Sequence, residues 1–448
     1  MLSVTQARET AQNLVERATT AGADAADAIY IGDRSSGVQV RLGELEDVQR
    51  SEGEEIGLRL FRGTRSASVS SSDLSADALA ALVDRAMAMA VEAPEDKFSG
   101  LAPAEMLMTG EPADLDNYDP IEPGPAALRA RALEAENAAL AVEGVSNSSG
   151  ASASASASTV ALAISSGFAG AYRASGHSCS ASVVAGEGAG MQRDYAYHTA
   201  RYAEDLEEAA EIGRRAGARA VARLRPAKLA AGRRAVIFEP RVAASLLGHF
   251  VAAINGSTVA RKASFLQDRM GNQIFARGVT ISDDPLRKRG LRSRPFDGEG
   301  LQVAPTDLVT DGVLRTWLAD SAAARQLGIA PTGHAVRGVG GAPGAGPSNL
   351  YLHAGLRSRK ELLSAFPNAI LVTELIGQGV NGLTGDYSRG AAGFLVSGGE
   401  IGAPLAEITI ASNLIEMFAS LEPANDLVFR RGIDAPTVLI PEMTVASA

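Results

Sequence analysis

The five histidines decide whether this chain can form a local zinc site. A zinc peptidase helix carries two histidines about one turn apart and a glutamate that activates the metal-bound water. No two histidines here lie three to five residues apart; they are His177, His198, His249, His334 and His353. His249 lies in SLLGHFVAAINGS (Ser245 to Ser257), which has helical spacing, and Phe250 rather than glutamate follows it. The sequence therefore predicts a structural or surface histidine at position 249.

Two other patterns of catalytic type are incomplete. Ser388 lies in a small-residue turn, but a nucleophile elbow needs glycine two residues before and two residues after the serine. Only Gly390 fits, because position 386 is aspartate. The glycine-rich run 338–346 lacks the Lys-Ser/Thr pair of a phosphate-binding loop. The missing motif residues disfavour a serine hydrolase and a nucleotide site. The glycine-rich run is therefore expected to be an irregular loop, which could close over an extended ligand.

A dense group of polar side chains follows the apolar stretch 370–373. Polar groups beside glycines suit a groove that recognises a peptide backbone, or a contact with a protein partner. A purely structural loop explains the same pattern, and both interpretations stay open. The residues expected at such a groove or partner contact are Glu374, Asn381, Asp386, Tyr387, Ser388 and Arg389.

Composition limits the class of protein. With 448 residues and a net charge of -10, the chain is too long for one ordinary core and would repel a polyanion such as DNA. The basic stretch 283–295 is flanked by acids and is expected to be a solvated loop. The single cysteine, Cys179, fits a reducing, cytoplasmic setting. Neither a signal-peptide pattern nor an apolar run long enough to span a membrane is found, so no membrane contact is expected.

Periodicity predicts an α+β fold. Besides 245–257, helical spacing recurs in four stretches, and residues 37–71 alternate like an antiparallel meander. The four further expected helices are 3–21, 73–93, 125–142 and 203–224. The Ala/Ser-rich segment 146–186 alternates with period two, which predicts strands with one apolar and one hydroxyl face rather than a linker. The expected units are an α+β subdomain 1–93, an extended connector 94–125, a second α+β subdomain 126–228 and a β-rich domain 229–448 with few helices.

Several long strings resemble the TldD/PmbA family, once called modulators of DNA gyrase, and its PmbA (TldE) branch in particular. The resemblance covers nearly the whole chain; the matching strings are MQRDYAYHTAR, GHFVAAINGSTVARKASFL, GLRSRPFDGEG, DGVLRTWLADSAAARQLGIAPTGHA, LVTELIGQGVNGLTGDYSRGAAGF and PLAEITIASNL. It implies a TldD/PmbA-like fold and a heteromeric cytosolic metalloprotease. The family's narrow cavity admits only unfolded or extended peptides, which implies roles in leader-peptide processing and antitoxin degradation.

The family's metal motif is degenerate in this chain. The TldD-type subunit holds zinc through His-Glu-x-x-x-His and a later cysteine. Carried over by position, the first histidine falls on Ser245, the glutamate on Leu246 and the second histidine on Phe250. None of these side chains can bind zinc or activate water. The region just before 435–443, where the ligand cysteine would lie, has no cysteine, and Cys179 lies far away in the other domain. The resemblance therefore implies a subunit without catalytic residues or metal, with zinc only in its partner.

The resemblance also implies partners. We expect a heterodimer with a TldD-like zinc subunit, or a homodimer when the chain is isolated, that takes unfolded peptides and contacts no nucleic acid directly. Two alternatives stay open. The chain could be a self-sufficient peptidase homodimer with an unrecognised site, or a regulatory protein that binds DNA gyrase.

Overall fold

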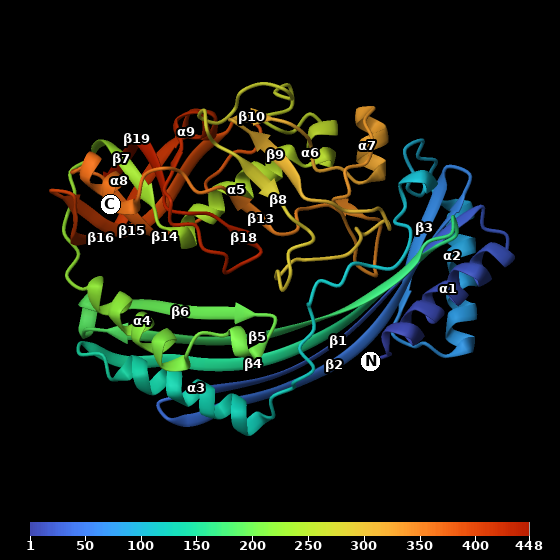
Figure 1. Ribbon diagram of the computed structural model, residues 1–448, viewed down its shortest axis with the longest axis horizontal. Helices are drawn as coiled ribbons and strands as arrows, with labels where there is room; N and C mark the ends of the chain where they lie inside the picture. The colour runs from blue at the N-terminus through green and yellow to red at the C-terminus, as the bar shows by residue number, and fades with distance from the viewer. Residues whose placement is uncertain (448) are drawn as a thin grey trace.

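A long, curved antiparallel sheet forms one side of the molecule, and the residues beyond 230 lie on its concave side (Figure 1). The structure is a computed structural model that describes residues 1–447. The sheet has the strand order β3-β2-β1-β4-β5-β6, and its strands are β1 (Ala25–Arg41), β2 (Glu44–Arg62), β3 (Arg65–Ser71), β4 (Val145–Ile164), β5 (Ala169–Ala185) and β6 (Gln192–Ala200). The segments 1–93 and 126–228 therefore contribute strands to the same sheet.

The alternation of alanine and serine builds the middle of this sheet. In β4, Ala151, Ala153 and Ala155 are buried, while Ser152 and Ser154 between them are partly exposed. The alanine face packs beneath helices, and the serine face is turned toward the concave side. The strand prediction for this segment is confirmed, and so is the meander, since β1, β2 and β3 pair in antiparallel order.

Two pairs of helices cover the convex face, one pair at each end of the sheet (Figure 1). Their bounds lie close to the predicted ones; the helices are α1 (Val4–Thr20), α2 (Ala76–Glu92), α3 (Pro125–Leu140) and α4 (Ala209–Ala222). Ser3 and Ser75 accept hydrogen bonds from backbone N–H groups of the first turns of α1 and α2, which explains why these helices start there. Helix α4 starts six residues later than expected, because residues 203–205 form a separate 3-10 turn, η3 (Ala203–Asp205).

The described part of the C-terminal half contains three further sheets and five helices, so the α+β class is confirmed. Its six-stranded sheet has the order β16-β15-β14-β7-β19-β17, with β7 (Gly232–Phe238), β14 (Ile370–Ile376), β15 (Asp386–Ser397), β16 (Glu400–Asn413), β17 (Glu422–Pro423) and β19 (Val438–Ser447). The five-stranded sheet has the order β10-β9-β8-β13-β18, with β8 (Ile281–Asp283), β9 (Thr306–Thr310), β10 (Val313–Leu314), β13 (Leu350–Leu352) and β18 (Ile433–Asp434). A two-stranded ladder joins β11 (Ala335–Val336) and β12 (Gly344–Ala345).

The helices of this half are short apart from one. They are α5 (Pro240–Ile254), α6 (Gly256–Ala260), α7 (Ser321–Leu327), α8 (Arg359–Ala365) and α9 (Leu414–Ser420). Helix α5 begins at Pro240, five residues before the predicted start at Ser245, because proline at the first helical position is already set for helical geometry. None of the helices in the described part of the chain has the length and hydropathy that crossing a membrane requires.

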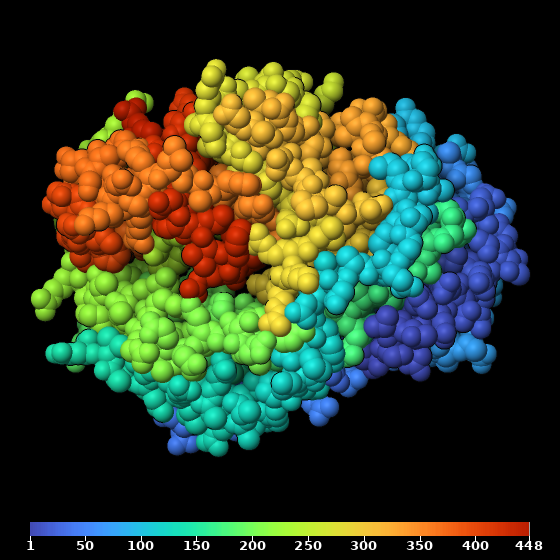
Figure 2. All heavy atoms as spheres, in the orientation of Figure 1, coloured from blue at the N-terminus to red at the C-terminus, as the bar shows by residue number. Residues whose placement is uncertain are grey.

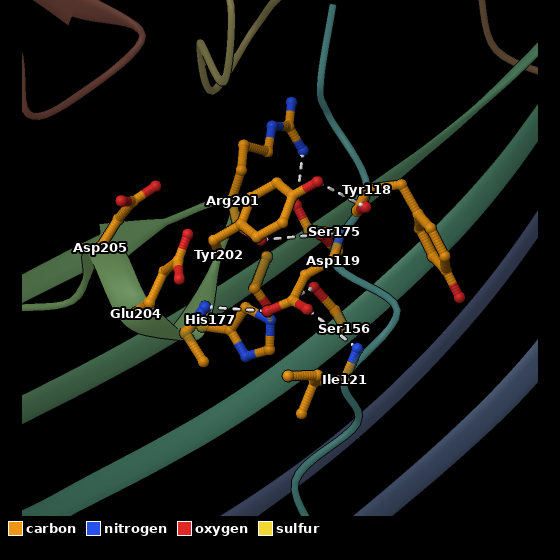
Figure 3. A network of polar contacts seen from close by, with 12 residues as sticks. Tyr118, Asp119, Ile121, Ser156, Ser175, His177, Arg201, Tyr202, Glu204 and Asp205 are labelled. Atoms are coloured by element: carbon orange, nitrogen blue, oxygen red, sulfur yellow. Dashed lines mark hydrogen bonds and ion pairs between the residues drawn. The ribbon is translucent and has the colours of Figure 1, made fainter.

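The connector between α2 and α3 runs along the line where the sheet meets the C-terminal half (Figure 2). Besides the 3-10 turn η1 (Ala104–Met106) it is extended, and a polar network fastens it to β5 (Figure 3). The Asp119 carboxylate lies 3.1 Å from Nε2 of His177 and accepts the Ala203 N–H at 2.9 Å. From the basic stretch, Arg289 pairs with Asp116 of the connector at 2.7 Å. Arg289 therefore anchors part of the basic stretch to the connector.

A buried group of three charges joins the sheet to the C-terminal half. Asp27 of β1 accepts a hydrogen bond from Nε of Arg59 of β2 at 2.9 Å, and Arg337, which follows β11, pairs with the same carboxylate. All three side chains are at least 90% buried. At Gly57 a Cβ would lie 2.1 Å from the carbonyl oxygen of Val339, so only glycine lets the chain after Arg337 approach the sheet this closely. The ion group therefore fixes how the two halves meet.

Glu299 lies near this group and should make folding stability depend on pH. Burial raises the pKa of Glu299 to about 7, although its carboxylate accepts the N–H and Oγ–H of Ser321 at 2.8 and 2.7 Å. The folded state therefore holds the proton that the unfolded chain releases near pH 4.5, so this residue's contribution to stability falls as the pH rises from about 4.5 to 7.

The loss should be roughly 3 kcal/mol over that window, and Glu299→Gln should remove it. Urea denaturation of both proteins at pH 5, 6 and 7 measures the difference, which should grow with pH in favour of the glutamine variant. Replacing exposed Glu16 by glutamine is the matched control and should leave the profile unchanged. Parallel profiles for wild type and Glu299→Gln would show that Glu299 ionises normally.

Candidate functional site

A pocket of about 390 Å³ lies where the end of the curved sheet meets helix α5 and strands β14 and β15. It gathers residues from distant parts of the chain, and three of the residues singled out from the sequence are among them: Ser245, Glu374 and Arg389. The other lining residues are Ser182, Arg193, Asp194, Tyr195, Arg223, Arg241, Val242, Thr373 and Leu375.

Asp194 of β6 is the centre of the charged network in this pocket. Its carboxylate accepts hydrogen bonds from Nη1 and Nη2 of Arg241 at 2.7 and 3.0 Å, and from Nη1 of Arg223 at 3.2 Å. Arg223 at the end of α4 also pairs with Glu374, while Nε of Arg241 donates to the Thr373 carbonyl at 2.7 Å. One carboxylate thus ties the curved sheet, helix α4 and the C-terminal half together.

The two arginines keep Asp194 ionised in a buried position. Burial alone would raise the Asp194 pKa, but the hydrogen bonds and charge of Arg241, with the charge of Arg223, outweigh burial and hold the pKa below its ordinary value. The Asp194 side chain is only 2% exposed, and those of Arg223 and Arg241 are 12% and 10% exposed. Each member would leave uncompensated charge behind if it were removed.

Arg389 is different from the other buried arginines in the pocket. It is 8% exposed, and its Nε donates to the Ile376 carbonyl at 3.4 Å. Within residues 1–447 no carboxylate lies within 4.0 Å of its guanidinium nitrogens, because Asp194 and Glu374 are engaged by other arginines. The pocket therefore contains a cation with no anion of its own.

The three positions that align with the family's metal motif have distinct surroundings on α5. Ser245 lines the pocket, and its Oγ donates to the Val242 carbonyl at 2.6 Å. Leu246 and Phe250 are 2% and 0% exposed. The Phe250 ring packs edge-on against Phe275 at 5.3 Å between centroids, deep in the core of the C-terminal half.

This set of side chains does not fit a divalent metal ion. The pocket offers two carboxylates, both already bound by arginines, and four arginines whose charge would repel a cation. His249 lies one residue before Phe250 and packs edge-on against Tyr387 at 5.9 Å between ring centroids. No group of three His, Cys, Asp or Glu side chains within the described residues is placed to hold a metal.

The remaining residues singled out from the sequence lie near β15 but outside the pocket. Tyr387 is 1% exposed and packs beneath the surface. Asn381 and Asp386 stabilise the turn before β15: the Asn381 Oδ1 accepts the Leu383 N–H at 2.9 Å, and the Asp386 carboxylate accepts the Thr384 hydroxyl at 2.6 Å. Ser388 is exposed. The structure thus brings Glu374 and Arg389 to the pocket and gives Asn381 and Asp386 local contacts.

A second, larger cavity of about 800 Å³ opens on the serine face of the same sheet. Serine, threonine and glycine residues make up half of its lining, and Gly338 and Val339 of the glycine-rich run belong to the lining too. Five charged side chains also line it: Asp33, Arg34, Glu54, Glu55 and Arg201. Ser175 and Gly176 of β5 line this larger cavity, which we call the serine cavity. Ser182 of the same strand lines the pocket around Asp194 and Arg389, which we call the arginine pocket. The two hollows therefore lie along one strand.

Sequence reasoning missed the residues that organise the pocket, namely Asp194, Arg223 and Arg241. A signal existed for Asp194. Strand β6 alternates between exposed residues such as Arg193 and Tyr195 and buried ones such as Ala196, and Asp194 falls on the buried face. A buried aspartate needs a cationic partner, although its identity could not be inferred from spacing.

Models of one family match three parts of the chain. They are described as PmbA/TldA metallopeptidase domain 1, central domain and C-terminal domain, and they match residues 26–90, 118–224 and 231–447. Metalloprotease PmbA of Escherichia coli O157:H7 is 38% identical over 411 residues, which cover 91% of this chain and 89% of that protein. A Metalloprotease PmbA homolog of Haemophilus influenzae is 36% identical and covers 98% and 96%.

Solved structures share the fold. A putative modulator of DNA gyrase from Bacteroides thetaiotaomicron has a TM-score of 0.92 at 25% identity, with 100% of each chain covered. TldE from Thermococcus kodakarensis has a TM-score of 0.85 at 19% identity and covers 97% of this chain and 99% of its own.

Replacing Asp194 tests whether its ion network holds the two halves together. Asp194→Asn leaves Arg241 and Arg223 without their shared buried anion, so it should lower the free energy of unfolding by about 3 kcal/mol at pH 7. Because the folded Asp194 pKa is depressed, its stabilisation is present above the unfolded pKa and is lost as the pH falls through the folded value. The penalty should therefore shrink below about pH 4.

Urea denaturation at pH 7 and at pH 3.5 measures both effects. Glu211→Gln is the matched control, since Glu211 and its partner Arg214 are more than half exposed, and it should cost no more than about 0.5 kcal/mol. A loss at Asp194 no larger than that of the control would contradict a structural role for the network.

Proposed function

Because the chain belongs to the PmbA/TldD metallopeptidase family, we propose that it acts as a non-catalytic subunit beside a zinc-bearing TldD-like partner. In this proposal the chain forms part of the wall of a cavity that admits extended peptides, and the partner supplies the metal and the catalytic groups. The observation that carries the proposal is the set of side chains on α5. Ser245, Leu246 and Phe250 occupy the positions at which the family's zinc motif has its first histidine, its glutamate and its second histidine.

The surroundings of these positions support a loss of the metal site. Phe250 is fully buried among aromatic side chains, so a histidine there would need the core to repack. The nearest polar groups form an arginine-rich pocket, whose field opposes a cation. Both features disfavour a metal ion at these positions.

Two relatives from one organism differ in their similarity to this chain, and the difference supports its assignment to the PmbA branch. The PmbA homolog of Haemophilus influenzae aligns over 98% of this chain at 36% identity. The TldD homolog of the same organism aligns over 46% at 25% identity. A chain of the PmbA type beside a separate TldD type is what a two-subunit peptidase requires.

The serine-lined cavity supports recognition of an extended peptide. Small hydroxyl side chains and glycines leave room for a peptide backbone and supply hydrogen-bonding groups along its length. Recognition through the backbone accepts many sequences but excludes folded proteins, whose backbone groups are already paired. Leader peptides and flexible segments are the substrate class that fits such a cavity.

Co-purification and peptide cleavage test the proposal. The isolated chain should contain less than one-tenth of an equivalent of zinc and should not cleave an unstructured peptide. Co-expression with the TldD-like chain of the same organism should yield a complex with about one zinc per pair and peptidase activity, measured by metal analysis and mass spectrometry of products.

A matched control locates the activity in the partner. Replacing the glutamate of the partner's His-Glu-x-x-x-His motif by glutamine should abolish cleavage while leaving the complex intact. Robust cleavage by the zinc-free isolated chain would instead establish the alternative of a self-sufficient peptidase and overturn the proposal.

A further inference from the structure

The arginine pocket has a surplus of positive charge that the described residues do not neutralise. Four arginines and two carboxylates line it, and both carboxylates are committed to Arg223 and Arg241. We propose that this pocket is an anion site in which Arg389 binds a carboxylate group of a peptide. That the carboxylate comes from a peptide rests on the proposed function; that the site takes an anion rests on the pocket alone.

Arg389 is the residue that points to a ligand. A buried guanidinium without an anion costs free energy, and folded proteins normally pair such a group. Arg389 is 8% exposed and lines the open pocket, with one long hydrogen bond from Nε to the Ile376 carbonyl. No hydrogen bond from its two Nη atoms to another residue is found within residues 1–447. These are the atoms that form a fork suited to a carboxylate.

Two neighbouring side chains are also short of hydrogen-bond partners. Nε2 of His249 and Oη of Tyr387 are buried and make no hydrogen bond within the described chain. Burial, and after it the charge of Arg389, lowers the His249 pKa, so the imidazole is neutral at pH 7 and can still donate or accept one hydrogen bond. An anion at Arg389 would offset the charge that acts on both rings.

The position of the pocket suits the end of an extended chain. Gly176 lines the serine cavity and Ser182 lines the arginine pocket, six residues along the same strand. At about 3.3 Å per residue this separation is roughly 20 Å, the length of about six residues of an extended peptide. A peptide that lies along β5 in the serine cavity could therefore place its carboxylate at Arg389.

Isothermal titration calorimetry on the full chain tests the site with three probes. These are acetyl-pentaglycine as the free acid, the same peptide as the C-terminal amide, and an amide with glutamate as its central residue. The free acid or the glutamate peptide should bind at least tenfold more tightly than the neutral amide. Which of the two binds distinguishes a C-terminal carboxylate from an acidic side chain.

Arg389→Gln should reduce the affinity for the carboxylate probe at least tenfold. It should leave the thermal midpoint unchanged or raised, because it removes an unpaired buried cation. The matched control is Arg233→Gln, a 73% exposed arginine of β7 outside the pocket, which should bind like wild type. A large loss of stability in Arg389→Gln with no change in affinity would make Arg389 structural and overturn the proposal.

The comparison of the three probes on the wild-type chain decides the question even where the variant fails to fold. Equal affinities for all three, or no binding of any of them up to millimolar concentration, would overturn the anion site. Such a result would leave the zinc content and cleavage activity of the two-subunit complex untouched, so the two proposals fail separately.

Discussion

The shared carboxylate of Asp194 is the interaction on which this part of the structure depends. It comes from the last strand of the curved sheet, yet its two guanidinium partners come from the end of α4 and the start of α5. A carboxylate that is 98% buried is stable only where its cationic partners are held in place. The register of β6, the end of α4 and the start of α5 are therefore coupled through Asp194. The shape and the charge of the arginine pocket follow from that arrangement.

The same network explains why a metal site and this pocket exclude each other. A zinc ion needs free carboxylate, imidazole or thiolate groups, and here every carboxylate of the pocket already neutralises an arginine. Phe250 fills its position with an aromatic ring that packs on Phe275 and Phe418. The packing and the charges around positions 245, 246 and 250 therefore both disfavour a metal ion there.

Local sequence patterns predicted much of the fold but only part of the site. The Ala/Ser alternation identified β4 and β5 because period two is a property of each strand alone. The helices near residues 3–21 and 73–93 were predicted because helical spacing is likewise local. Glu374 and Arg389 were found because they follow an apolar strand. Asp194 and Arg241 were missed because their contact spans 47 residues and depends on how the curved sheet meets the C-terminal half.

That meeting of sheet and C-terminal half also gives the two hollows different chemical character. Around Gly57 the sheet approaches the C-terminal half so closely that no side chain fits, and the ions of Asp27, Arg59 and Arg337 lock the contact. Further along the strands lie first the serine cavity, whose lining includes three carboxylates and two arginines, and then the arginine pocket, whose lining includes four arginines and two carboxylates. Alanine on the convex side lets α3 and α4 pack tightly, and serines of the other face line the serine cavity. One alternating sequence thus serves the core on one face and the cavity on the other.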